Sequence, residues 1–92
     1  MPRATVYTSL YCPYCDRAKR LLTEKLVDFD EIDVTRQSGL REELRIRSGG
    51  RTTVPQIWVG NTHVGGCDDL YDLERRGKLD ALLASSADHG ES

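Results

Sequence analysis

The strongest constraint on the fold of this chain is a pair of cysteines, Cys12 and Cys15, which stands between a β-prone run and a helical pattern. The run Ala4–Thr8 ends shortly before the pair and has the composition of a strand. Pro13 lies inside the pair, and proline is tolerated as the first residue of a helix. Apolar residues then recur at helical spacing, so we expect a helix from Pro13 to Leu26.

A second β-prone segment follows this helix, with Phe29, Ile32 and Val34 as its apolar residues. The order strand, helix, strand forms a βαβ unit. In such a unit the two strands are parallel and the crossover is right-handed. The first third of the chain therefore predicts an α/β fold.

The rest of the chain carries shorter elements between glycine-containing turns. We expect a weaker helix that opens at Ser38 or Gly39, continues through Leu44 and ends at 48–50. A third strand, Gln56–Val59, then leads through a tight turn, Gly60–Asn61, into an antiparallel fourth strand around His63–Val64. A third helix, capped by Asp68 or Asp69, runs through Arg76 and ends at Gly77, and a brief final helix spans Leu79–Leu83. The sequence thus predicts one domain, residues 1–85, and a polar, disordered tail, residues 86–92.

Size and charge exclude several classes of protein. A chain of 92 residues is enough for one domain, and its net charge of −2 attracts neither nucleic acid nor an anionic membrane. No apolar run approaches the ~20 residues of a membrane span, and the N-terminal stretch lacks the apolar segment of a signal peptide. We therefore expect a monomer in the cytoplasm, where disulfides are mostly transient and catalytic.

The position of Cys12 predicts a nucleophile. If Cys12 is the N-cap of the first helix, its thiolate can accept hydrogen bonds from the N–H groups of Tyr14 and Cys15. It also lies at the positive end of the helix dipole, and both effects favour the thiolate, which is the reactive form. Cys15 is inside the helix, at a Cα separation of about 5–6 Å that suits a disulfide. We expect Cys12 to attack and Cys15 to resolve the mixed disulfide.

Other readings of the cysteines fit less well. The chain has a third cysteine, Cys67, and an odd count does not make a closed disulfide framework. A closed zinc site needs four ligands, and Cys67, His63 and His89 include no second close pair. We expect no bound metal, and we expect Cys67 to be a packing residue.

Three separated motifs in this order resemble the dithiol glutaredoxins of the bacterial glutaredoxin 3 type, over about residues 4 to 84. The resemblance implies a thioredoxin-like fold, with a four-stranded mixed sheet and helices on both faces, a cis peptide before Pro55, and glutathione as reducing co-substrate. The motifs are Tyr7-Thr8 with Cys12-Pro13-Tyr14-Cys15 and Arg17-Ala18-Lys19, then Thr52-Thr53-Val54-Pro55-Gln56-Ile57, and Gly65-Gly66-Cys67-Asp68-Asp69-Leu70.

The resemblance also implies a glutathione site. One carboxylate of glutathione would bind backbone N–H groups at the start of the third helix, an aspartate there would pair with its ammonium, and the backbone of Val54 would bind its cysteinyl part like an added strand. The implied contacts are Tyr14, Thr53, Val54, Pro55, Gly66, Cys67, Asp68 and Asp69, with Arg41, Arg51 or Lys19 as the cation for the glycyl carboxylate. Ser9 departs from the family pattern, because many members have lysine there.

The expected function is therefore glutathione-dependent reduction of protein disulfides and glutathione mixed disulfides. The expected partners are glutathione, glutathionylated or disulfide-containing proteins and, indirectly, NADPH through glutathione reductase. Two alternatives stay open: a similar redoxin reduced by thioredoxin reductase, and a module that binds an iron–sulfur cluster or zinc.

Overall fold

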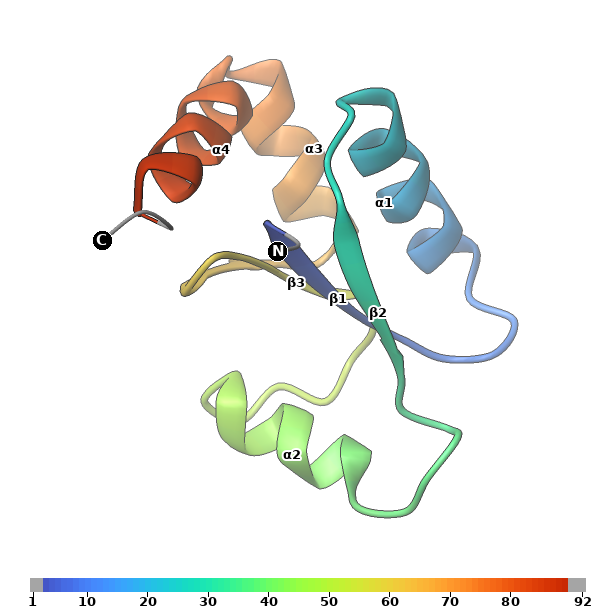
Figure 1. The fold of residues 1–92 in the computed structure, drawn as a ribbon. Helices are drawn as coiled ribbons and strands as arrows, with labels where there is room; N and C mark the ends of the chain where they lie inside the picture. Colours follow the sequence, from blue (N-terminus) through green and yellow to red (C-terminus); the bar gives the residue numbers. More distant parts are fainter. Residues whose placement is uncertain (1–2, 90–92) are drawn as a thin grey trace.

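The computed structural model describes residues 3–89, with side chains to residue 84, and it begins with the expected βαβ unit (Figure 1). Strand β1 (Ala4–Thr8) leads through a short loop into helix α1 (Pro13–Glu24), and the chain returns as strand β2 (Phe29–Asp33). Strands β1 and β2 are parallel and in register from one end to the other. The first loop therefore brings the cysteine pair to the end of β1.

The second half completes a mixed sheet whose strand order is β2-β1-β3-β4. Helix α2 (Leu40–Arg47) precedes strand β3 (Gln56–Val59), which is antiparallel to β1, and strand β4 (Thr62–Gly65) forms a hairpin with β3. Helix α3 (Cys67–Arg75) starts directly after β4. The predicted four-stranded mixed sheet is confirmed, and the start of α3 lies near the N-terminal end of β3.

Helices cover both faces of this sheet, with α1 and α3 on one side and α2 on the other (Figure 1). The alternation of side chains along a strand explains this arrangement: on β1, Val6 faces the α1 side and Tyr7 faces the α2 side. The larger apolar cluster lies on the first side and consists of Ala4, Val6, Ala18, Leu21, Leu22, Val27, Ile57, Val59, Leu70, Leu79 and Leu83. Full burial of one leucine there contributes about 1.5–3 kcal/mol.

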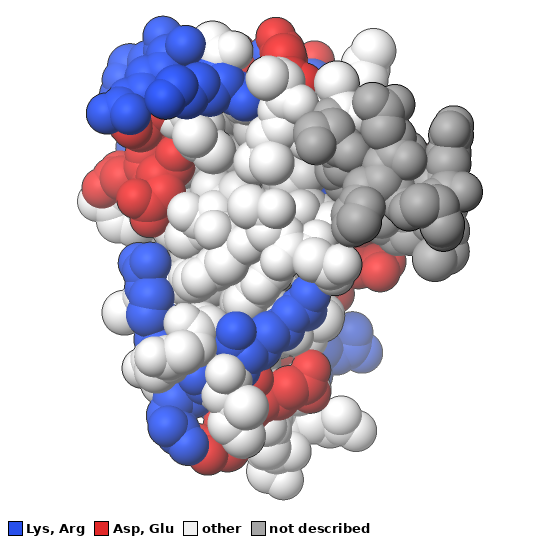
Figure 2. Space-filling view, turned by 90° about the vertical axis from the view of Figure 1, so that its left-hand side faces the viewer, with Lys and Arg blue, Asp and Glu red and all other residues white. Residues whose placement is uncertain are grey.

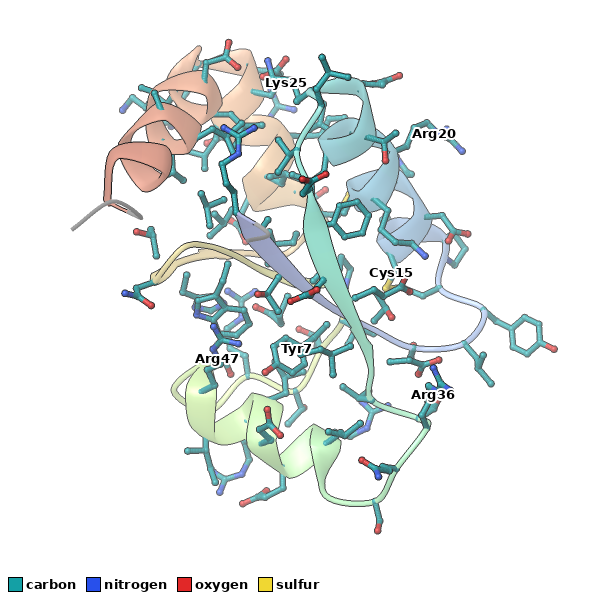
Figure 3. The ribbon with its side chains drawn as sticks, in the orientation of Figure 1. Tyr7, Cys15, Arg20, Lys25, Arg36 and Arg47 are labelled. Atoms are coloured by element: carbon teal, nitrogen blue, oxygen red, sulfur yellow. A yellow bond between two sulfur atoms is a disulfide. The ribbon has the colours of Figure 1, made fainter. Side chains whose placement is uncertain are left out.

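The smaller cluster, on the α2 side, contains Tyr7, Val34, Leu44 and Trp58. The Tyr7 hydroxyl accepts a hydrogen bond from Arg47 on α2 at 3.1 Å, and the Arg47 guanidinium lies 4.4 Å from the centre of the Trp58 ring. Figure 3 shows Arg47 and Tyr7 close together between the sheet and α2. Helix α2 is thus held by aromatic and cationic contacts as well as by Leu44.

The end of α1 differs from the prediction, because the helix stops at Glu24 and Leu26 is 86% exposed. Leu26 has a left-handed φ of 59°, its N–H donates to Thr23 O, and the N–H of Val27 donates to Leu22 O at 2.9 Å. These two bonds form a Schellman motif, which usually has glycine at the left-handed position. The motif turns Leu26 outward and brings Val27 into the core.

The last helix, α4 (Lys78–His89), is longer than the brief helix that we expected. Alanine and serine continue the sequence after Leu83, and alanine has the highest helix propensity. Of the expected polar tail, residues 90–92 lie outside the described residues. No helix in the described part of the chain has the length and apolarity needed to cross a membrane.

Charged side chains of both signs lie around an uncharged middle on the face shown in Figure 2.

Strand β2 lies at one edge of the sheet and has β1 as its neighbour. Two of its acidic residues, Asp30 and Glu31, are exposed. Glu31 accepts hydrogen bonds from Thr8 Oγ1 at 2.9 Å and from Lys19 Nζ at 3.0 Å.

Candidate functional site

Cys12 is the N-cap residue of α1, as predicted, and Pro13 follows it inside the first turn. The backbone N–H of Cys15 donates to Cys12 Sγ at 3.1 Å. The expected second bond, from the N–H of Tyr14 to the same sulfur, does not form: the Cys12 side chain accepts from Cys15 alone. One backbone donor and the positive end of the helix dipole therefore face the sulfur.

The two cysteines differ in burial, as expected for attacking and resolving groups. Cys12 is half-buried, whereas Cys15 is 1% exposed. The structure joins them as a disulfide, with a Cα separation of 5.2 Å. The spacing of the motif therefore allows the disulfide to form within the first turn of α1.

The peptide bond between Val54 and Pro55 is cis, as the family resemblance implied. The carbonyl oxygen of Val54 lies 4.0 Å from Cys12 Sγ. The segment before β3 therefore runs beside the reactive pair, although the two are more than forty positions apart in sequence.

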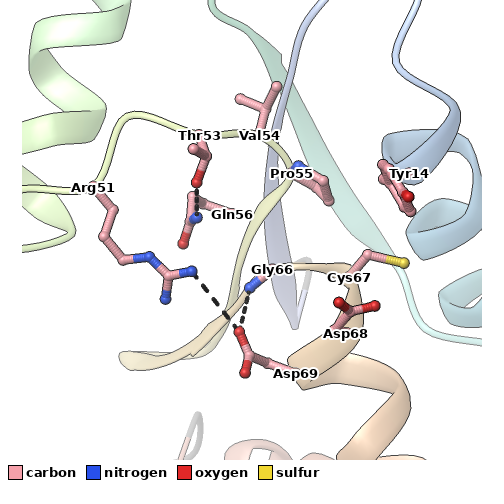
Figure 4. A pocket seen from close by; sticks show the side chains of 10 residues that line it. All are labelled: Tyr14, Arg51, Thr53, Val54, Pro55, Gln56, Gly66, Cys67, Asp68 and Asp69. Carbon is pink, nitrogen blue, oxygen red and sulfur yellow. Dashed lines mark hydrogen bonds and ion pairs between the residues drawn. The ribbon is translucent and has the colours of Figure 1, made fainter.

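A pocket of about 190 Å³ opens between this segment, Tyr14 and the start of α3 (Figure 4). All eight residues that the resemblance named as glutathione contacts lie on its wall, and so does one of the three candidate cations, Arg51. The pocket is lined by Tyr14, Arg51, Thr53, Val54, Pro55, Gln56, Gly66, Cys67, Asp68 and Asp69. The sequence thus predicted the set of residues that the fold brings together, with Gln56 as an addition.

Asp69 stabilises the beginning of α3 from inside the helix, not as its N-cap. The N-cap is Gly66, and the N–H of Gly66 donates to Asp69 Oδ2 at 2.9 Å. The prediction that Asp68 or Asp69 is the cap residue is therefore wrong in position. The Gly66 N–H was also expected to bind a ligand carboxylate, but Asp69 already accepts it.

Gly65 makes this arrangement possible. Its φ of +116° is a conformation that side chains disfavour, and a Cβ at Gly65 would lie 2.8 Å from Asp69 Cγ. Glycine adopts such angles without the steric penalty. The turn from β4 into α3 therefore requires glycine at this position for both backbone angle and space.

Of the three cations suggested for the site, Arg51 is the one on the pocket wall. Its guanidinium lies 3.9 Å from Asp69 Oδ2. Lys19 instead pairs with Glu31 at 3.0 Å, and Arg41 donates to the carbonyl of Thr52 at 3.3 Å. Lys19 therefore pairs with a carboxylate of β2 and is not one of the residues that line the pocket.

Cys67 is 5% exposed and lies at the first position of α3. Burial raises the pKa of the Cys67 thiol, which disfavours the reactive thiolate. This agrees with a packing role. In the described part of the chain, no group of three or more His, Cys, Asp or Glu side chains is arranged to hold a metal ion.

Gln56 belongs to the second motif, but the sequence alone assigned it no role. Its side chain is fully buried, whereas its neighbours on β3 are apolar. A polar residue within a buried strand must find hydrogen-bond partners, and this was the signal that could have revealed it. Its Nε2 donates to Thr53 Oγ1 at 3.1 Å.

Comparisons with known proteins agree with this geometry. The glutaredoxin family model matches residues 4–64. The chain is 61% identical to a glutaredoxin of Pseudomonas aeruginosa over 85 residues, which cover 92% of this chain and 100% of that protein. It is 52% identical to glutaredoxin 3 of Escherichia coli K12 over 83 residues, which cover 90% of this chain and 99% of that protein.

Among solved structures, the crystal structure of a buckwheat glutaredoxin–glutathione complex is similar with a TM-score of 0.84. The sequence identity is 29%, and the match covers 94% of this chain and 80% of that chain. The fold is thus the thioredoxin-like α/β fold that the sequence predicted. With its cysteine pair at the start of α1, the chain belongs to the glutaredoxin family of thiol–disulfide oxidoreductases.

Proposed function

We propose that this protein uses glutathione to reduce protein disulfides and glutathione mixed disulfides. The observation that carries the proposal is the position of Cys12 Sγ. It accepts the Cys15 N–H at 3.1 Å and lies 4.0 Å from Val54 O. Val54 in turn lines the pocket described above, together with charged residues such as Arg51 and Asp68. A nucleophile and a site for a small charged peptide therefore meet at one place.

In the monothiol route, the thiolate of Cys12 attacks the glutathione sulfur of a mixed disulfide. The target sulfur leaves with the electron pair of the broken bond as a thiolate, and glutathione stays bonded to Cys12. The thiolate of a second glutathione then attacks the bound glutathione sulfur. Glutathione disulfide leaves, and the Cys12 thiolate is restored. Glutathione reductase and NADPH would regenerate glutathione.

In the dithiol route, Cys12 attacks a protein disulfide and forms a mixed disulfide with the target. Cys15 gives up its proton and attacks Cys12 Sγ, so that the second target sulfur leaves as a thiolate. The product is the Cys12–Cys15 disulfide, which two molecules of glutathione reduce to the dithiol while forming glutathione disulfide. The 5.2 Å Cα separation supports this step.

The pocket supplies groups that match glutathione, which has two carboxylates and one ammonium. The backbone N–H groups at the first positions of α3, Cys67 and Asp68, would bind one carboxylate, while the side chain of Asp68 or Asp69 would pair with the ammonium. Arg51 would bind the other carboxylate, Val54 would bind the cysteinyl backbone, and Tyr14 would border the groove. The buckwheat glutaredoxin–glutathione complex supports binding of the same ligand here.

The proposed partners are glutathione and disulfide-containing or glutathionylated proteins, with the protein acting as a monomer. We place this activity in the cytoplasm, because glutathione and thioredoxin systems keep thiols reduced there. The small net charge of −2 supports protein and peptide substrates over nucleic acid.

The test is reduction of a glutathionylated peptide, followed through NADPH consumption. One reaction contains glutathione and glutathione reductase, and the other contains thioredoxin reductase in their place. Turnover only in the first is expected. Turnover only with thioredoxin reductase would show that this enzyme, and not glutathione, supplies the electrons. A coloured, iron-containing dimer from anaerobic purification would favour the cluster-binding alternative.

A further inference from the structure

A buried amide side chain forms part of the wall of the pocket. Gln56 is 0% exposed, and both ends of its side chain are engaged. Its Nε2 donates to Thr53 Oγ1 at 3.1 Å, and its Oε1 lies 2.8 Å from Nε2 of His63 on β4. Figure 4 shows the first of these contacts. We call this series the His63–Gln56–Thr53 network.

The chemistry of the three groups gives the network a direction. The Oε1 atom of Gln56 can only accept, so His63 Nε2 carries the hydrogen. The Nε2 atom of Gln56 can only donate, so the Thr53 hydroxyl accepts from it. The hydrogen of the Thr53 hydroxyl then remains for an acceptor on the pocket side. Thr53 is exposed and lines the pocket.

His63 is held in place by its neighbours. Its ring stacks on Trp58, with centroids 4.4 Å apart and planes 20° from parallel. Burial lowers the pKa of His63, helped by Arg51 and Arg47 and opposed by Asp69. A neutral histidine has one N–H, and the bond to Gln56 uses it. The network therefore starts from a fixed ring with a defined donor.

We propose that Gln56 and His63 are positioning residues that orient the Thr53 hydroxyl as a donor toward a carboxylate of the bound ligand. Thr53 and Arg51 belong to the same loop and line the same pocket, so a neutral and a charged donor lie on this side. Asp68 and Asp69 lie on the α3 side. Because the carboxylate is one of the two in glutathione, this role rests on the proposed function.

The first test measures the hydrogen positions without any ligand. Two-bond ¹H–¹⁵N NMR spectra of the reduced wild-type protein at neutral pH report which ring nitrogen of His63 is protonated. The expected result is the neutral Nε2–H form. The Nδ1–H form would reverse every bond of the network and overturn the proposal.

The second test separates binding from chemistry. His63→Phe keeps an aromatic ring on Trp58 but removes the N–H, and His63→Gln returns an N–H near the position of Nε2. For a glutathionylated peptide, we expect His63→Phe to raise KM about two- to tenfold, the range for one neutral hydrogen bond, with kcat unchanged. His63→Gln should restore KM, and Thr62→Val on the same strand serves as control.

A double variant shows whether His63 acts through Thr53. Thr53→Val removes the hydroxyl, so adding His63→Phe to it should raise KM no further. The proposal would be refuted if the effects of Thr53→Val and His63→Phe on KM multiply in the double variant. An unchanged KM in His63→Phe would refute it as well. Absence of glutathione-dependent turnover in the wild-type protein would instead refute the proposed function. The NMR measurement needs no glutathione, so it distinguishes the two failures.

Discussion

Replacement of Gly65 by alanine tests how the turn into α3 is built. At a φ of +116°, an alanine has a backbone cost of about 1–3 kcal/mol. The new Cβ would also approach Asp69 Cγ to 2.8 Å, so the carboxylate must move and release the Gly66 N–H. A hydrogen bond to a charged group contributes about 1.5–3 kcal/mol. The Asp69 side chain is 53% exposed, and water competition reduces this loss to about 1 kcal/mol.

Gly50→Ala is the matched control, because Gly50 has a φ of +118° but no atom lies within 4 Å of the place that its Cβ would take. Gly65→Ala should lower the free energy of unfolding by about 2–4 kcal/mol, which is about 1 kcal/mol more than Gly50→Ala. Urea unfolding followed by circular dichroism measures both. Equal losses in the two variants would refute the role of the Asp69 contact.

Four further predictions concern the site. Cys12→Ser should abolish turnover of every disulfide substrate, and measurable residual activity would contradict its role as nucleophile. Cys15→Ser should keep reduction of glutathionylated peptides and lose reduction of protein disulfides, as separate assays of the two substrates would show. Asp69→Asn keeps an acceptor for the Gly66 N–H but removes the negative charge, so KM for glutathione should rise while the urea midpoint changes little. An unchanged KM would show that another group binds the ammonium. Because the folded-state pKa of His63 lies below its ordinary value of 6.5, its contribution to stability is complete above that pH and is lost as the pH falls through the folded-state value. Urea midpoints between pH 8 and pH 5 should therefore fall less steeply in His63→Gln than in the wild-type protein.

Much of the fold could be predicted because local patterns and tertiary structure agree. The strand, the proline and the helical spacing around Cys12 all point to the same βαβ unit, and Gly77 ends α3 where its sequence predicts, with a φ of 71°. Leu26 was misplaced because helical periodicity does not show where a Schellman motif turns the chain. The length of α4 was underestimated because the serines that follow Ala84 are also typical of polar tails, although the alanines beside them favour a helix.

The site shows the same limit. The pocket residues came from the family resemblance, since nothing local to Val54 shows that it lies beside Cys12 in space. The Gly66–Asp69 bond is local, since three residues separate the partners, and it was missed because the start of α3 was placed too late in the sequence. Side-chain partners that depend on tertiary contact were less accessible: Lys19 on α1, for example, pairs with Glu31 on β2. Such pairings depend on distances between elements, and sequence spacing determines these only within one helix or strand.

The acidic edge of the sheet has a consequence for self-association. An edge strand exposes unpaired backbone N–H and C=O groups, which can pair with the edge of another molecule, and charged side chains on the strand oppose such pairing. Strand β2 is an edge strand and carries Asp30, Glu31 and Asp33. Two copies that extended their sheets through β2 would bring these carboxylates together. The same strand that completes the βαβ unit therefore also protects the sheet against growth into aggregates.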